Sequence, residues 1–196
     1  SYGSPKWGTR WNAGKNPITN DNMNSDDWAL FTSSIAELFG KLTDGFIYVC
    51  HAPGPDGRVL ACALDSRFHW SATIVWSKDR LVLGRAKYQR QYELVWFGWT
   101  GDTGKNFNED RTLTDVWEIQ RPSASIEHPT MKPVELVSRA ITHASQSGDT
   151  IADPFLGSGT TMVACEKLGR KCRAIEIEPK YVAVTLERMS DMGLEP

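Results

Sequence analysis

The chain has 196 residues, of which 40% are hydrophobic and 23% are charged, and this globular composition predicts one compact domain. A formal charge of -2 excludes a generally basic nucleic-acid-binding protein, so contact with phosphate requires a local basic face. The four cysteines form neither a Cys-x-x-Cys zinc pattern nor a disulfide framework, and this predicts reduced thiols in a cytoplasm.

The first third of the chain begins with a long polar segment. Residues 1–27 are rich in Gly, Asn, Asp and Pro without helical or strand periodicity, so we expect an irregular loop, with no signal peptide. Apolar residues at helical spacing predict a helix over Trp28–Leu42, capped by one of Ser25, Asp26 and Asp27. The aromatic and β-branched run Phe46–Cys50 predicts a buried strand.

The middle of the chain alternates shorter elements with polar segments. We expect a helix over Arg58–Phe68 and strands over Trp70–Trp76 and Gln91–Phe97. Residues 98–127 are polar and rich in Gly, Asn and Asp, with only Asp115–Ile119 strand-like, and we interpret them as an extended excursion. No apolar run in the chain reaches the length that spans a bilayer.

The last third has a regular order of elements. A helix is expected over Val134–Ala144, a strand over Thr150–Asp153, a second helix over Thr160–Leu168 and a second strand over Lys171–Glu176. This order is typical of parallel βαβ packing. We therefore predict an α/β fold with a mostly parallel central sheet and helices on both faces.

The loop between the first of these strands and its following helix has a chemical signature. Glycines at 157 and 159 allow backbone to approach a ligand at a helix N-terminus, and Glu176 at the end of the next strand can accept both hydroxyls of a ribose. A phosphate-binding P-loop would need a Lys, which is absent from Gly159-Thr160-Thr161. A dinucleotide fingerprint would need Gly or Ala at position 162, which is Met162. The loop therefore predicts a site for another adenosine-bearing cofactor, and the alternative is a purely structural turn.

Two motifs identify a family. The segment DPFLGSGTT from Asp153 to Thr161, with HPTMKP from His128 to Pro133 upstream, resembles the DNA amino-methyltransferases in the β arrangement, where the catalytic motif precedes the cofactor motif. DVWEI, YVCHA, WSATIVWSKD and LGRAKYQRQYELVWFGWTG resemble other parts of that family, so the likeness covers nearly the whole chain. It implies a Rossmann-like fold that binds S-adenosylmethionine and requires no metal.

The resemblance also implies site residues. The methionine and adenosine pocket would be lined by Asp153, Phe155, Gly157, Ser158, Gly159 and Thr160. Glu176 would hold the ribose, and His128, Thr130 and Lys132 would flank the amino-acid end of the cofactor. A Lys at that end agrees with the negative charge of the cofactor's carboxylate.

The catalytic motif of the family is Asp/Asn-Pro-Pro/Ser-Tyr, often followed by Gly, and the complete motif does not occur in this sequence. Ser1-Tyr2-Gly3 matches its end, so Ser1 and Tyr2 are the catalytic candidates, with Tyr2 stacking on a flipped base. The alternative is a chance tripeptide. The strands that precede this motif in the family have no counterpart here, so we expect the natural polypeptide to extend N-terminally and this chain alone to be a catalytically incomplete fragment.

DNA contact is expected from a basic segment. The segment from Ser77 to Gln91 contains one acidic residue, Asp79, and five basic ones: Lys78, Arg80, Arg85, Lys87 and Arg90. Such a segment suits contact with the phosphate backbone, and the alternative is a solvated loop without a binding role. Residues 98–127 are the expected target-recognition segment, between a catalytic half over 1–97 and a cofactor half over 128–196. His51 and His69, without a ligand cluster, are expected to be structural.

The predicted reaction is methyl transfer from S-adenosylmethionine to the exocyclic N6 amine of adenine in double-stranded DNA, within a restriction-modification system. Cytosine N4 methylation and a fragment that binds cofactor and DNA without turnover remain alternatives. Cytosine C5 chemistry is disfavoured because none of the four cysteines follows a Pro. We expect the protein to act in the cytoplasm of a bacterial, archaeal or phage-infected cell. A homodimer is possible, and no association with a membrane is expected.

Overall fold

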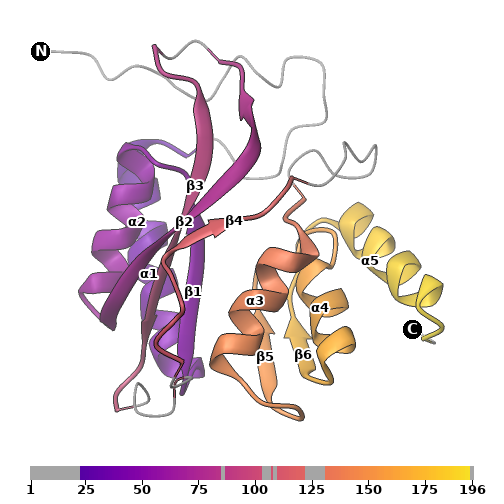
Figure 1. The fold of residues 1–196 in the computed structure, drawn as a ribbon. Helices are drawn as coiled ribbons and strands as arrows, with labels where there is room; N and C mark the ends of the chain where they lie inside the picture. The colour runs from indigo at the N-terminus through magenta and orange to yellow at the C-terminus, as the bar shows by residue number, and fades with distance from the viewer. Residues whose placement is uncertain (1–22, 85–86, 103–106, 108–109, 122–130, 195–196) are drawn as a thin grey trace, which may run out of the picture.

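The computed structural model describes residues 23–84, 87–102, 107, 110–121 and 131–194. Its helices and strands follow one another in the order α1 (Ser25–Leu42), β1 (Phe46–His51), α2 (Pro55–Asp65), β2 (His69–Val82), β3 (Arg90–Trp99), β4 (Val116–Glu118), α3 (Val134–Ala144), β5 (Thr150–Asp153), α4 (Thr160–Leu168), β6 (Lys171–Ala174) and α5 (Pro179–Asp191). Figure 1 shows β1 to β4 with α1 and α2 on one side of the molecule, and β5 and β6 with the last three helices on the other.

The described strands form two sheets. The larger sheet has the order β1-β3-β2-β4, and β5 pairs with β6. The β2–β4 and β5–β6 pairs are parallel, but β1–β3 and β2–β3 are antiparallel, so the expectation of a mostly parallel sheet is wrong for the larger sheet. The reason is local for β2 and β3, which follow each other along the chain and pair as a hairpin.

Side-chain alternation along β3 gives the larger sheet two apolar faces. Trp96 packs with Ala36 of α1 and Leu64 of α2, so these helices cover one face. Val95 and Phe97 point to the other face, where they join a buried cluster that includes Trp117 and Leu136. Because Leu136 belongs to α3, helices do lie on both faces of this sheet, as predicted.

A smaller core holds the C-terminal part together. Ile141 of α3 packs against Ala164 and Cys165 of α4, with Ile151 and Cys172 of the two short strands at its edge. The structure confirms the predicted bounds of α3, β5 and α4.

Three local differences from the predicted elements have simple causes. The N-cap of α1 is Asn24, whose side-chain oxygen accepts hydrogen bonds from the backbone N–H groups of Asp26 and Asp27. Strand β2 extends to Val82 because its polar second half also pairs with β3. The register is irregular there, so the sequence shows no alternation of apolar and polar residues that would predict the extension. Helix α5 was not predicted, although Pro179 at its first turn is a typical start signal.

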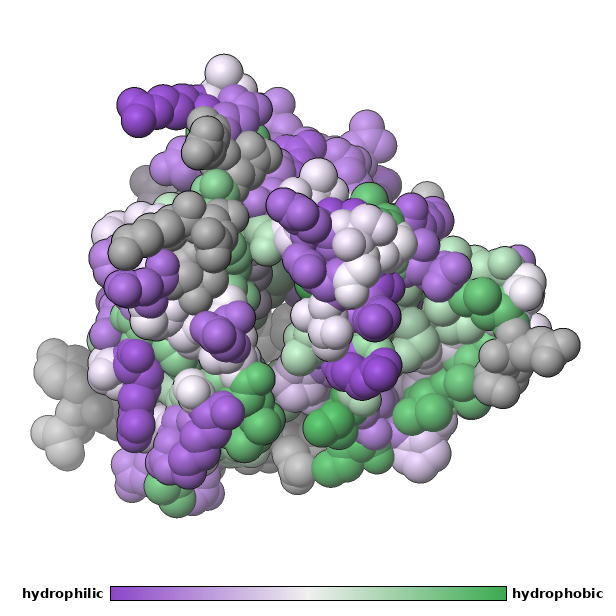
Figure 2. All heavy atoms as spheres, turned by 90° about the horizontal axis from the view of Figure 1, so that it is seen from below, coloured by the Kyte–Doolittle hydropathy of each residue, from purple (hydrophilic) through white to green (hydrophobic). Residues whose placement is uncertain are grey.

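The surface mixes polar and apolar residues. Figure 2 views the molecule from below and shows apolar residues in separate patches among hydrophilic ones on that face. Within the described part of the chain, no helix is long and apolar enough to cross a membrane.

Candidate functional site: a glycine loop and its acidic partner

The glycine loop joins the end of β5 to the start of α4. Gly157 has φ 57° and Gly159 has φ 83°, in the left-handed region that glycine adopts without strain. At Gly159 a Cβ atom would also lie 2.7 Å from the Cγ2 atom of Thr185 on α5. The two glycines therefore allow both the sharp turn and the close packing of the loop against α5.

Asp153, at the end of β5, braces this loop. Its Oδ1 atom accepts a hydrogen bond from the backbone N–H of Phe155 at 2.9 Å, and its Oδ2 atom accepts one from the Thr161 hydroxyl at 2.5 Å. The carboxylate thus ties the strand to both the loop and the first turn of α4.

Glu176 lies directly against the loop, as the sequence predicted from its place after β6. Its Oε2 atom accepts the backbone N–H of Gly157 at 2.7 Å, and its Oε1 atom accepts that of Glu178 at 2.8 Å. Each carboxylate oxygen retains a further lone pair for a hydroxyl donor. An acid fixed by two backbone donors beside a glycine turn can hold a ribose.

Further contacts seat the loop between α3 and α5. The Thr185 hydroxyl lies 2.9 Å from Tyr181 O within α5 and 3.3 Å from Gly157 O, so the two carbonyls share its one proton, and Arg188 donates to Ser158 O. Thr160, which is buried like Ser158, donates its hydroxyl to Lys132 O at 3.3 Å. Sequence reasoning missed Thr185 and Arg188 because it did not predict the helix that carries them.

Apolar side chains stand exposed around the loop. Phe155, Ile175 and Ile177 are 56%, 67% and 70% exposed. The Phe155 ring lies edge-on to Phe31 of α1, with centroids 6.2 Å apart. The two isoleucines flank Glu176 in the sequence, and that adjacency is the signal that could have identified them. Exposed apolar groups beside an acid that is free to accept hydroxyl donors suit the faces of a purine ring.

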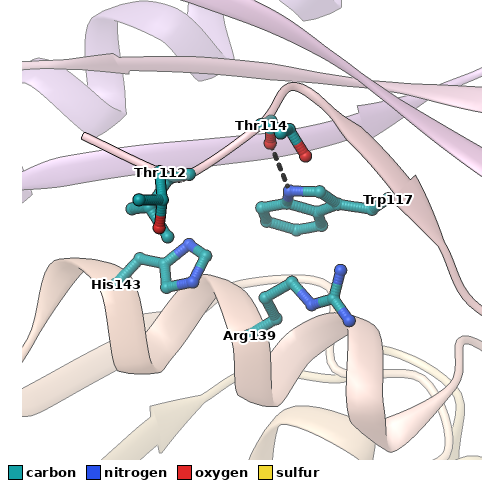
Figure 3. Close-up of a pocket in the computed structure, with 6 residues that line it drawn as sticks. Thr112, Thr114, Trp117, Arg139 and His143 are labelled. Atoms are coloured by element: carbon teal, nitrogen blue, oxygen red, sulfur yellow. Dashed lines mark hydrogen bonds between the residues drawn. The ribbon is translucent and has the colours of Figure 1, made fainter. Parts of the chain in front are cut away.

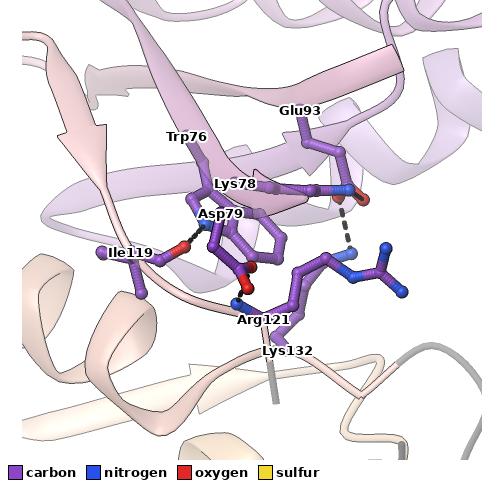
Figure 4. A network of polar contacts seen from close by, with 7 residues as sticks. All are labelled: Trp76, Lys78, Asp79, Glu93, Ile119, Arg121 and Lys132. Atoms are coloured by element: carbon purple, nitrogen blue, oxygen red, sulfur yellow. Dashed lines mark hydrogen bonds and ion pairs between the residues drawn. The ribbon is translucent and has the colours of Figure 1, made fainter. Parts of the chain in front are cut away.

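The side chain of Lys132 belongs to a cluster of two lysines around one glutamate (Figure 4). Glu93 of β3 pairs through Oε1 with Lys78 Nζ at 2.6 Å and through Oε2 with Lys132 Nζ at 2.8 Å. Both ammonium groups also face the Trp76 ring, at 4.8 and 5.8 Å from its centroid. Burial raises the pKa of Glu93, but the charges of Lys132 and Lys78 outweigh it and hold the pKa below its ordinary value.

The four predicted DNA contacts that the structure describes lie in different environments. Lys78 is only 9% exposed and lies inside the cluster just described, so it is not part of an exposed basic face. Arg80 is exposed and pairs with Asp79 at 2.9 Å, while Lys87 and Arg90 are exposed on the end of the hairpin that β2 and β3 form. Tyr88 beside them is 91% exposed. Figure 1 shows this hairpin rising above the rest of the sheet.

Residues 112–117, which lie in the described part of the segment after β3, form a pocket with α3. This pocket of about 200 Å³ is lined by Thr112, Leu113, Thr114, Trp117, Arg139 and His143. In Figure 3 the Trp117 ring lies above α3, from which His143 and Arg139 point towards it. The Trp117 Nε1 atom donates to Thr114 O at 3.0 Å. Trp117 is thus a core residue that joins β4 to α3.

Several predicted residues lie outside the described part of the chain: Ser1, Tyr2, Arg85, His128 and Thr130. The histidines expected to be structural are both described. The His51 ring contacts the Ala52 carbonyl at 3.2 Å, and the His69 ring stacks on Trp99 with centroids 4.3 Å apart. Among the described residues, no group of three or more His, Cys, Asp or Glu side chains is placed to hold a metal ion.

Comparison with protein families gives one match over most of the chain. Residues 11–187 match the model of the N6/N4 DNA methylases. Among curated relatives, the Type II methyltransferase M2.LlaDCHI of Lactococcus lactis subsp. cremoris is 33% identical over 126 residues, which are 62% of this chain and 43% of that protein. The DNA adenine methyltransferase YhdJ of Escherichia coli (strain K12) is 36% identical over 87 residues, 42% of this chain and 30% of that protein. The chain spans about two fifths of the length of M2.LlaDCHI.

Solved structures share the fold. The M1.HpyAVI–SAM complex superposes with a TM-score of 0.70 and 23% identity over 85% of each chain. The cytosine-N4-specific PvuII DNA methyltransferase also gives a TM-score of 0.70, with 20% identity over 92% of this chain and 76% of that one. These likenesses confirm the Rossmann-like methyltransferase fold that the sequence predicted.

Proposed function

Because the chain belongs to the N6/N4 family of DNA methylases, we propose that it binds S-adenosylmethionine and transfers the methyl group to the exocyclic N6 amine of adenine in DNA. The observation that carries this proposal is the Glu176 carboxylate fixed 2.7 Å from the backbone nitrogen of Gly157, at the mouth of the glycine loop. Methyl transfer to an amine needs an electrophilic methyl group, and the cofactor supplies it.

The residues around the loop match the three parts of the cofactor. Glu176 would accept the ribose hydroxyls, and Ile177 and Phe155 offer exposed apolar surface for the adenine ring and its surroundings. The wall of the proposed cofactor pocket would be formed by the loop residues Gly157, Ser158, Gly159 and Thr160, with Asp153 bracing the loop. Lys132, with His128 and Thr130 in the same motif, would hold the amino-acid end.

For DNA, we propose that the exposed end of the β2–β3 hairpin contacts the phosphate backbone. Lys87 and Arg90 would provide the charge, together with Arg80 of β2 and with Arg85, which lies between Arg80 and Lys87 in the sequence. Residues 98–127 remain the proposed target-recognition segment. Ser1 and Tyr2 are the proposed remnant of the catalytic motif, with the Tyr2 ring stacking on the flipped base.

Adenine N6 is favoured over cytosine N4 by the relatives. The curated relative from Escherichia coli is named a DNA adenine methyltransferase, whereas the cytosine-N4-specific PvuII enzyme shares only the fold at 20% identity. We further propose that the protein acts in the cytoplasm of a bacterial, archaeal or phage-infected cell, beside a restriction enzyme. Duplex DNA and cofactor are its proposed partners, with a homodimer as an option.

Calorimetry tests the cofactor assignment. S-adenosylmethionine and S-adenosylhomocysteine should bind the folded chain, and Glu176→Ala should weaken binding by about tenfold or more, since two hydroxyl contacts to a charged acceptor are lost. Glu187→Ala, at an exposed position on α5, is the matched control and should bind like the unmodified chain. Absence of binding to a folded preparation would exclude the proposed cofactor.

Incubation of the natural polypeptide, including any residues that precede Ser1, with labelled cofactor and duplex DNA tests the reaction. N6-methyladenine in the digested DNA would support the proposal, and N4-methylcytosine would redirect it to the other base. Bound cofactor without methylated DNA would favour the alternative, a module that binds cofactor and DNA without turnover.

A further inference from the structure

The cluster of Lys78, Glu93 and Lys132 carries two positive charges and one negative charge. Of the two lysine side chains, Lys78 is 9% exposed and Lys132 is 33% exposed. Lys78 therefore has almost no access to a ligand, and its charge serves mainly to neutralise Glu93. The ammonium group of Lys132 is the surplus charge, on the accessible side of the cluster.

The backbone of Lys132, the residue that carries this charge, contacts the helix after the glycine loop. The carbonyl of Lys132 accepts the hydroxyl of Thr160, the first residue of the helix that follows the glycine loop. The main chain of Lys132 therefore lies beside the start of α4, next to the proposed cofactor site.

The neighbouring acids do not neutralise the positive charge of Lys132. Asp79 pairs with Arg80 at 2.9 Å and accepts the backbone N–H of Arg121 at 2.9 Å. Asp153 accepts hydrogen bonds from Thr161 and from the backbone of Phe155. Glu93 is thus the only described acid paired with Lys132, and Lys78 shares it.

We propose that Lys78 is a positioning residue that acts through Glu93: by neutralising this carboxylate from the buried side, it leaves Lys132 with a net positive charge for the carboxylate of S-adenosylmethionine. This inference rests on the proposed function and assigns a role to a residue that touches no ligand. Without Lys78, Glu93 pairs with Lys132 alone, and the pair is neutral. Removing both Lys78 and the charge of Glu93 restores the surplus.

Calorimetry with two probes tests this charge balance. S-adenosylhomocysteine carries the carboxylate, and 5′-methylthioadenosine lacks the whole amino-acid end. Lys78→Met should weaken binding of S-adenosylhomocysteine about tenfold and leave that of 5′-methylthioadenosine unchanged. The double variant Lys78→Met/Glu93→Gln should recover most of the lost affinity, which a merely structural role of Lys78 would not predict.

The control is Lys41→Met, the same substitution at an exposed ion pair on α1. It should leave both affinities unchanged, and thermal unfolding should show that every variant is folded. If Lys78→Met binds S-adenosylhomocysteine normally, or if the double variant is as weak as the single one, the inference is wrong. If the unmodified chain binds neither probe, the proposed function fails instead.

Discussion

Single residues of the glycine loop show how closely its backbone is specified. Gly159 combines a positive φ with a neighbour, Thr185, that leaves no room for a Cβ atom. Gly45, in the turn before β1, has nothing within 4 Å of the position of its Cβ atom. The same substitution at these two glycines therefore separates a required glycine from a tolerant one.

Gly159→Ala should lower the free energy of unfolding by about 2 kcal/mol or more, because Ala is strained in the left-handed region and its Cβ atom displaces Thr185. Gly45→Ala should change it by less than about 0.5 kcal/mol. Urea unfolding followed by circular dichroism measures both. Equal effects at the two positions would show that the loop relaxes around the new side chain.

At the level of elements, the β2–β3 hairpin divides its basic residues between two roles. Lys78, near the base, is buried against Glu93 and Trp76, whereas Lys87 and Arg90 are exposed near the end. Composition makes these residues look equivalent, but the hairpin places them in different environments. Contact with phosphate is therefore expected only from its outer part.

The double variant Lys87→Ala/Arg90→Ala should weaken binding to duplex DNA and make the slope of log K against log salt less steep by about 1.8, because about 0.9 is expected for each lost phosphate contact. Fluorescence anisotropy at several salt concentrations measures this slope. Lys167→Ala/Lys171→Ala, at exposed lysines of α4 and β6, is the matched control. An unchanged slope in the hairpin variant would remove the hairpin from the DNA interface.

At the scale of the whole molecule, the two sheets are joined by side chains. Leu136 of α3 is buried in the core of the larger sheet, Lys132 reaches Glu93 of β3, and Phe155 meets Phe31 of α1. The six tryptophans in the described part of the chain lie on α1 and on strands β2, β3 and β4, so their fluorescence reports on the larger sheet and the helix packed against it. The proposed cofactor site lies around the smaller one.

A ligand at the glycine loop should therefore stabilise the larger sheet as well. At a concentration of 100 times Kd, S-adenosylhomocysteine contributes about 2.7 kcal/mol, which corresponds to an increase in Tm of roughly 5–10 °C for a cooperative unit of this size. Melting followed by tryptophan fluorescence measures it. A shift seen by circular dichroism but not by fluorescence would mean that the two sheets unfold independently.

The sequence by itself determined the elements around the glycine loop, with the bounds of α3, β5 and α4, because helical periodicity and turn glycines are local signals. It also placed Glu176 at the loop, since the ends of adjacent parallel strands share one edge of a sheet. It missed α5, although Pro179 marked its start. The family followed from two motifs read together.

Only the tertiary structure decided which charges meet. The pairing of Lys78 and Lys132 with Glu93 joins residues from three separate segments, and no local pattern encodes such a contact. The same holds for the antiparallel pairing of β1 with β3, and for the buried place of Trp117 against α3. Contacts between distant segments depend on how whole elements pack, so the sequence predicted the glycine loop, and the tertiary structure paired Glu93 with both Lys78 and Lys132.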